Sequence, residues 1–180
     1  MPYSIYRDLT AGGGALIDQI SHWDDNLFSG SKLPPDFETP VAFEIDLDTE
    51  GRRMPTLFMT PAFVTRRAFH DALLAAGVNN VDAYPAVIQN TETGEEFTDY
   101  LFLNVVGRVR CADMAASEYK AIGPGINLID RVVVEESKLP SVHIFRLDED
   151  PLKVVISDRL YERLGDAGFD DIYYQPVVVR

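Results

Sequence analysis

The residues best suited to chemistry are few and lie far apart in the sequence. The three histidines, His22, His70 and His143, lack the HxxxH and HExxH spacings that bring two imidazoles to one metal ion. The single cysteine, Cys111, excludes an internal disulfide and a CxxC metal or redox motif. Because Cys111 follows an apolar run, we expect a buried thiol rather than a nucleophile. These groups therefore predict no metal site, no cofactor and no catalytic residue.

Two other patterns suggest chemistry, but neither matches a known motif. The glycine run AGGGA at 11–15 lacks the spacing of GxGxxG and the Lys-Ser/Thr ending of a phosphate loop, so it indicates a turn. In EIDLD a strand would place Glu44, Asp46 and Asp48 on one face. That face is typical of a solvated sheet surface or of a surface that binds a partner. General acid–base catalysis by these carboxylates remains an alternative that no motif supports.

Acidic residues exceed basic ones by a wide margin. The chain has 29 Asp and Glu against 16 Lys and Arg, which gives a net charge of −13. Such a protein repels phosphate backbones and anionic lipids, so we expect neither nucleic acid nor a membrane as a partner. Attraction to a basic protein is one interpretation of the charge, and a merely well-solvated surface is the other.

Several acidic clusters follow or connect expected strands, and we predict that they are loop tips that contact a partner. The residues selected for this role are Asp48, Glu50, Glu95, Glu96, Asp148, Glu149 and Asp150. Because exposed aromatic side chains often anchor protein interfaces, we add Trp23, with Phe28 and Tyr174 as further candidates.

Length and composition predict a globular protein. The chain has 180 residues, of which 46% are hydrophobic and 25% charged, as in ordinary folded domains. No stretch has the roughly 18 apolar residues that a membrane helix needs, and the first residues do not resemble a signal peptide. We expect a soluble, cytoplasmic protein that is a monomer or a small homo-oligomer.

Two parts of the chain resemble each other. LLAAGVNNVDAYPAVI at 73–88 aligns with LGDAGFDDIYYQPVVV at 164–179 when one residue is gapped. Upstream of each, SKLP occurs at 31–34 and again at 137–140. The pattern in each copy is that of an apolar strand, a helix, a glycine and a second strand. We therefore predict two diverged β-β-α-β units, at about 31–90 and 137–180.

Local signals place the helices inside these units. Thr65 and Ser157 are the expected N-caps, and Gly77 and Gly168 are the expected stops. Apolar residues four apart face inward, at Phe69 and Leu73 in the first helix and at Leu160 and Leu164 in the second. The proline in each closing strand, Pro85 or Pro176, indicates an edge strand or a bulge.

Together these elements predict an α+β fold with a mixed, mainly antiparallel sheet and a few short helices. We expect a single domain over 1–180, in which a strand-helix-strand segment at 97–136 joins the two units. Its first strand should run from about Tyr100 to Arg110. We expect the first 30 residues to form one strand and an irregular segment on the outside.

The segment DRVVVEESKLPSVHIFRLDEDPLKVVISDRLYERLGDAGFDDIYYQPV, at 130–177, resembles a family of bacterial immunity proteins. These proteins belong to polymorphic toxin systems and to contact-dependent or type VI secretion systems, and the family was first described as a domain of unknown function. YLFLNVVGRVRCADMAASEY, at 100–119, is similar to the central segment of the family. The shared motifs are scaffold motifs, so they assign no functional residue.

The resemblance implies a non-enzymatic protein that binds and neutralises a cognate bacterial toxin. A basic toxin would fit the acidic charge of this chain. Two alternatives remain open: a carboxylate-based hydrolase with a site between the two repeats, and a general acidic protein-interaction module.

Overall fold

A computed structural model describes residues 2–8, 17–21, 27–45, 54–59, 62–123, 126–169 and 172–180. Within these residues the protein is dominated by strands and has two α-helices, α1 (Arg67–Ala75) and α2 (Asp158–Asp166), and a 3-10 helix, η1 (Glu136–Lys138). The strands are β1 (Tyr3–Asp8), β2 (Ile17–Gln19), β3 (Val41–Ile45), β4 (Leu57–Phe58), β5 (Val64–Arg66), β6 (Val81–Asn90), β7 (Glu96–Val105), β8 (Arg108–Val109), β9 (Glu118–Gly123), β10 (Ile126–Arg131), β11 (Val133–Val134), β12 (Ile144–Leu147), β13 (Val154–Ile156), β14 (Ile172–Pro176) and β15 (Val178–Val179). The predicted α+β class is confirmed.

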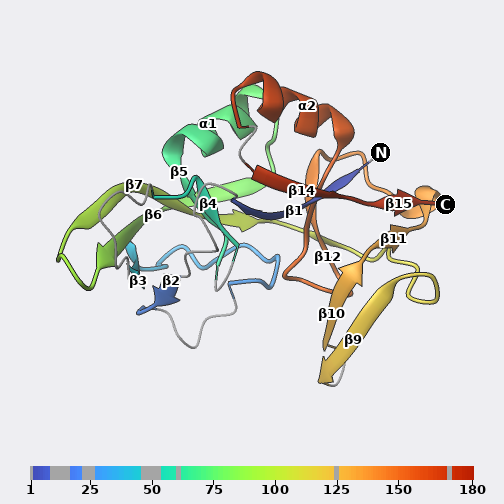
Figure 1. Ribbon diagram of the computed structural model, residues 1–180, viewed down its shortest axis with the longest axis horizontal. Coiled ribbons are helices and arrows are strands. Elements are labelled where there is room, and N and C mark those ends of the chain that lie inside the picture. The colour runs from blue at the N-terminus through green and yellow to red at the C-terminus, as the bar shows by residue number, and fades with distance from the viewer. Residues whose placement is uncertain are drawn as a thin grey trace.

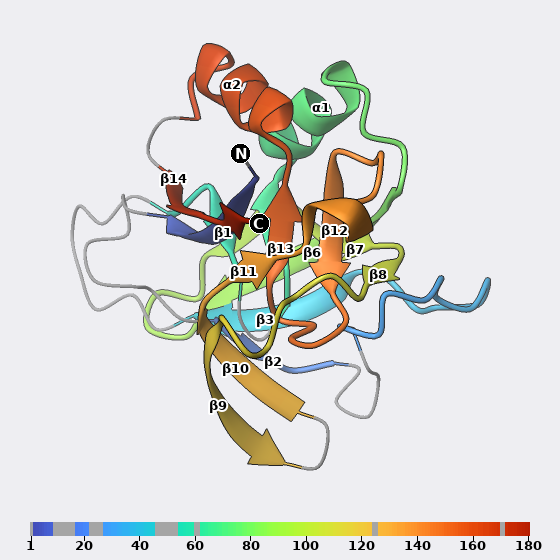
Figure 2. The same cartoon turned by 90° about the vertical axis from the view of Figure 1, so that its right-hand side faces the viewer.

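The described strands form two main sheets and two small pairs. The larger sheet has six strands in the order β2-β3-β6-β7-β5-β4, and the other has five in the order β14-β1-β13-β12-β8. Most neighbours are antiparallel, and the parallel pairs are β3–β6, β8–β12 and β11–β15. In Figures 1 and 2 both helices lie over one side of the sheets, and the β9–β10 hairpin projects from the opposite side.

Helix α2 has the cap and the stop that the sequence predicts. The backbone N–H of Leu160 donates to Ser157 Oγ at 3.2 Å, which satisfies one of the N–H groups that lack a partner in a first helical turn. Leu160 and Leu164 are both buried. Gly168 follows the helix with a φ of 88°, a conformation that favours glycine.

Helix α1 has the predicted inner face and stop but not the predicted cap. Thr65 lies in β5 opposite Leu101 of β7, so strand pairing holds it in extended backbone, and its side chain is fully buried. The helix begins at Arg67 without a side-chain cap. Phe69 and Leu73 are its buried residues, as expected.

Three groups of buried apolar residues stabilise these layers. The first lies between the helices and both main sheets, and includes Phe69 of α1, Leu164 of α2 and Leu103 of β7. The second contains the inward-facing residues of β3, among them Phe43, together with residues of β6 and β7. The third packs β12 and β13 against the segment that contains Cys111. The first group joins elements of both predicted units in one core.

Two expectations about chain order are wrong. The first 30 residues contain two strands, β1 and β2, rather than one, and β1 is paired on both sides, with β13 and β14. The helix expected after the central strand is absent: residues 114–117 form a turn and Glu118–Gly123 form β9, which pairs with β10. Pairing with a distant segment overrides local helix propensity in this case.

The prolines lie where a missing N–H is tolerated. Pro176 ends β14, which is an edge strand of its sheet. Pro85 lies within β6, but the pairing of β6 with β3 begins only at Ala86. The register between β6 and β7 also shifts between Ala86 and Ile88. Both prolines therefore fit the predicted edge or bulge positions.

Candidate partner-binding surfaces

The acidic residues of the β6–β7 hairpin lie at an exposed turn, as expected. Glu95 and Glu96 are both exposed. The backbone of the turn is held by the N–H of Asn90, which donates to the carbonyl oxygen of Glu95 at 2.8 Å. Gly94 adopts a φ of 71°. These carboxylates are therefore available to a partner, and their contact with one stays a prediction.

Asp148, in the turn between β12 and β13, interacts with cations of the protein itself. Its Oδ1 lies 3.3 Å from Arg108 Nε, and its Oδ2 lies 2.7 Å from Arg110 Nη2. Its side chain is 22% exposed, so solvent only partly screens these pairs. Much of the charge of Asp148 is thus neutralised within the chain.

The next two acids bind backbone groups. The N–H of Ala112 donates to Glu149 Oε1 at 3.1 Å. Asp150 is 1% exposed and accepts from the N–H of Ile129 at 2.9 Å and of Leu152 at 3.2 Å. Burial raises the pKa of the Asp150 carboxyl, and the bond from Ile129 partly opposes that rise.

The prediction that Asp150 lies exposed at a loop tip is therefore wrong. The segment does connect two strands, but the side chain of Asp150 points inward to hold β10. One carboxylate oxygen accepts from Ile129 of the hairpin and the other accepts from Leu152 of the turn itself. The sequence shows the acid but not the donor, which lies 21 positions away.

The other predicted contact residues are less informative. Asp48, Glu50 and Trp23 lie outside the described residues. Phe28 is half-buried with its ring over the guanidinium of Arg146, at 5.3 Å. Tyr174 is half-buried and packs edge-on against Tyr161, with ring centroids 5.0 Å apart. Neither aromatic ring is a fully exposed anchor.

One contact between a serine and a histidine was not evident in the sequence. His143 Nδ1 lies 2.9 Å from Ser157 Oγ. A serine nucleophile is activated in this way by an adjacent base, but this hydroxyl also accepts from Leu160 as the cap of α2. The contact is therefore explained as an extended helix cap.

The remaining chemical groups favour no catalytic site. Cys111 is fully buried, and burial raises the pKa of its thiol to about 12, so it is a buried apolar residue as predicted. No cluster of three or more His, Cys, Asp and Glu side chains suited to a metal ion occurs in the described part of the chain. The groove between α1 and α2 contains Arg163 and Asp166 among alanines. A hydrolase site between the units would need more polar groups than this groove offers.

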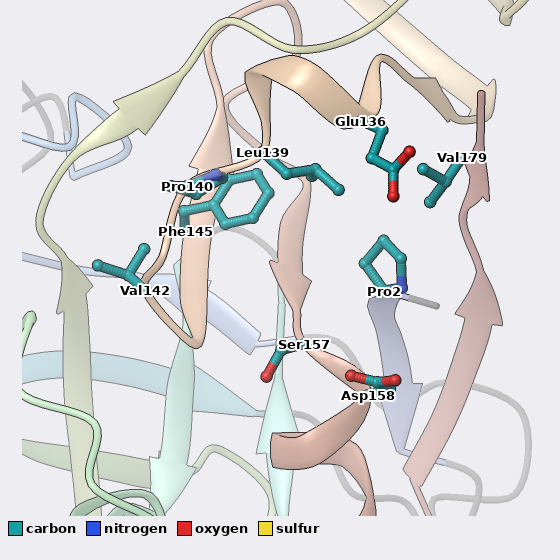
Figure 3. Close-up of a pocket in the computed structure, with 9 residues that line it drawn as sticks. All are labelled: Pro2, Glu136, Leu139, Pro140, Val142, Phe145, Ser157, Asp158 and Val179. Atoms are coloured by element: carbon teal, nitrogen blue, oxygen red, sulfur yellow. The ribbon is translucent and has the colours of Figure 1, made fainter.

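A pocket lies between η1, the C-terminal strand and the first residues of α2 (Figure 3). Its volume is about 330 Å³. Apolar side chains form most of its lining, and Glu136, Ser157 and Asp158 supply the polar groups. Figure 3 shows Glu136 and Asp158 on opposite sides of the space. The residues that line it are Pro2, Glu136, Leu139, Pro140, Val142, Phe145, Ser157, Asp158 and Val179.

The β9–β10 hairpin is a second surface that the sequence did not identify. Tyr119, Ile122 and Leu128 on its two strands are exposed. Its base is fixed to the body of the protein, because Ile129 donates to Asp150 and Asn127 Nδ2 donates to the carbonyl oxygen of Glu149 at 3.3 Å. The hairpin thus projects from a base that is fixed by hydrogen bonds, and it has apolar side chains on its surface.

Comparison with known families identifies a relationship. The model of an immunity protein family, Imm11, matches residues 18–179, which include both helices, the β9–β10 hairpin and all of the pocket lining except Pro2. No curated protein matches the chain. Among the described residues no helix has both the length and the apolar character required to cross a membrane.

Proposed function

We propose that this chain, which belongs to the immunity protein family Imm11, binds one toxin protein of its own lineage and thereby neutralises it. The observation that carries the proposal is the family match, which extends over nearly the whole chain, from residue 18 to residue 179. The proposed partner is a cognate toxin of a polymorphic toxin or secretion system. The proposed site of action is the bacterial cytoplasm.

The surface chemistry supports binding rather than turnover. An inhibitor requires a rigid surface that is complementary to its target, and it needs no reactive group. The exposed glutamates Glu95 and Glu96 and the net charge of −13 would attract a basic toxin and speed its association. The hydroxyl group of Ser157, which contacts His143, also caps α2. This structural use of the serine favours a non-enzymatic role.

The proposal is tested by expressing the chain together with the toxin domain encoded next to its gene. We expect growth to be restored only when the chain is at least equimolar with the toxin, because each molecule occupies one toxin. An inactive variant of the toxin should co-elute with the chain as a stable complex in size-exclusion chromatography. A toxin domain from an unrelated locus is the control, and it should neither co-elute nor be neutralised.

Two results would count against this proposal. Protection at amounts far below equimolar would indicate that the chain acts as an enzyme, as the hydrolase alternative requires. Failure of the chain both to protect and to co-elute would leave the general interaction module as the better description.

A further inference from the structure

The pocket beside η1 has the size of a site for one side chain. Pockets for small-molecule ligands have volumes of about 300–1,000 Å³, and this one, at about 330 Å³, is at the lower end of that range. Its apolar walls include Leu139, Val142 and Phe145. Such walls favour the aliphatic part of a long side chain, whose burial contributes roughly 0.8 kcal/mol per CH₂ group.

Glu136 gives the pocket its negative charge. It is exposed, and Figure 3 shows its carboxylate directed toward Pro2 and Val179 at the pocket. The nearby cations have other partners, because Lys138 Nζ lies 2.6 Å from Glu135 Oε1 and the guanidinium of Arg180 pairs with Asp113. No described residue forms an ion pair with Glu136.

Asp158 and the N-terminal end of α2 also lie at this pocket. Asp158 interacts with the amino group at the N-terminus of the chain, which lowers the pKa of its carboxyl, so only the carboxylate of Glu136 is left to bind a cation of a partner. The first turn of α2 carries a positive charge of roughly +0.5, which is smaller than the full negative charge of a carboxylate. The pocket therefore favours a cation.

We infer that this pocket receives an arginine side chain of the toxin, with the guanidinium on Glu136 and the aliphatic stem against the apolar walls. The inference rests on the proposed function. Arginine is preferred to lysine because its planar guanidinium is weakly hydrated and can bond a carboxylate through two N–H groups. It is also among the residues that contribute most at interfaces. The excess negative charge of the chain, −13, complements a partner that presents such a residue.

The chemistry of the pocket is tested first without the toxin. The isotope-labelled protein is titrated with N-acetyl-arginine methylamide, and binding is followed by NMR. We expect shifts at the backbone amides of Leu139, Val142 and Val179. The citrulline analogue, which is neutral and nearly the same shape, should bind roughly two- to fivefold more weakly, as expected for an exposed ion pair. E136Q should lose this preference, whereas D36N, at an exposed position that does not line the pocket, should retain it.

The same variants then test whether the toxin supplies the arginine that enters the pocket. E136Q should raise the dissociation constant of the toxin complex roughly tenfold or more, because the interface desolvates the ion pair, and D36N should raise it less than threefold, with circular dichroism confirming that both variants are folded. If the toxin binds E136Q as tightly as wild type, the inference is wrong and the proposed function stands. If wild type does not bind the toxin, the proposed function fails, even if the pocket still prefers arginine to citrulline. Equal binding of arginine and citrulline to wild type would also overturn the inference.

Discussion

The carboxylate of Asp150 joins two distant segments, because it accepts hydrogen bonds from Ile129 of β10 and from Leu152 of its own turn. Glu95, by contrast, is exposed at the end of the β6–β7 hairpin. Acidic residues in this chain thus fall into two kinds at the level of single side chains. Those that accept backbone N–H groups stabilise the fold, and those that face solvent are free to contact a partner.

Replacing Asp150 should weaken the attachment of the hairpin. D150A leaves the buried N–H of Ile129 without its acceptor, so we expect the free energy of unfolding to fall by about 1–3 kcal/mol. Chemical denaturation measures this change. D130A is the matched control, since Asp130 is exposed on the same hairpin, and its effect should stay within about 0.5 kcal/mol.

The effect of D150A should also depend on pH. Burial raises the pKa of Asp150 in the folded state, so the folded protein holds this proton more tightly than the unfolded chain. The stability that Asp150 contributes is therefore greatest below its unfolded pKa and declines as the pH rises through the raised folded value. We expect D150A to cost more stability near the acidic end of this window than at neutral pH. A cost that does not vary with pH would contradict the shift.

Thr65 and Ser157 were both predicted as helix caps, but removing the hydroxyl group should change the stability of the protein differently at the two positions. S157A removes the acceptor for Leu160 and should cost about 1 kcal/mol. Thr65 Oγ1 is buried without a hydrogen-bond partner among the described residues. T65V keeps the shape and removes that unsatisfied group, so it should be neutral or stabilise by up to about 1 kcal/mol. Thermal melts of both variants measure the difference, and equal losses would show that Thr65 has a cap-like role after all.

At the level of elements, the two main sheets share one arrangement. Strands β4-β5-β7-β6 in the larger sheet and β12-β13-β1-β14 in the smaller follow the same order, and every neighbouring pair within each set is antiparallel. Each helix links the second strand of its set to the fourth. The third strand differs in origin, because β7 follows its unit and β1 comes from the start of the chain. This arrangement supports the internal repeat, which stays a prediction.

The helix ends of the two units should be equally sensitive to glycine substitution. Gly77 and Gly168 have φ values of 89° and 88°, and an added Cβ would meet nothing within 4 Å at either position. G77A and G168A should therefore each cost about 1–2 kcal/mol through backbone strain alone. Urea denaturation gives both values. G165A, within α2 and without a positive φ, should instead stabilise by about 0.5–1 kcal/mol. Loss of stability in G165A would contradict this explanation.

Local sequence signals predicted where the helices lie better than they predicted which strands pair. The cap at Ser157, the glycine stops and the inward apolar pairs act within a few residues, and so both helices were placed to within about two residues at each end. The position of β1 and the existence of β9 depend on pairing with distant segments, which no local pattern records. The pocket was missed for the same reason, since Glu136 and Ser157 line it from separate elements. Among the predicted contact acids, only Glu95 and Glu96 could be placed as exposed at a turn.

At the level of the whole molecule, some acidic residues are exposed to a partner and others are paired or buried. Asp148 is paired with Arg108 and Arg110, and Asp150 is buried. The exposed acids of the β6–β7 turn therefore contribute more to the outward field than the acids of the β12–β13 turn. Charge reversal at the β12–β13 turn would also disturb the fold, so a test of electrostatic steering should use the β6–β7 turn.

The paired substitution E95K/E96K should slow association with a basic toxin. Each replacement changes a charge of −1 to +1, so the net charge rises by 4, from −13 to −9. Because long-range attraction acts before contact, we expect the association rate to fall roughly tenfold at low salt and much less at high salt, where the Debye length is only about 3–8 Å. The dissociation rate should change less than twofold. Surface plasmon resonance across a salt series measures both rates.

E162K/D166K, on exposed positions of α2, produces the same net charge on another face. Equal slowing by both pairs would show that net charge alone steers the toxin, whereas an unchanged association rate in E95K/E96K would show that these glutamates only keep the protein in solution.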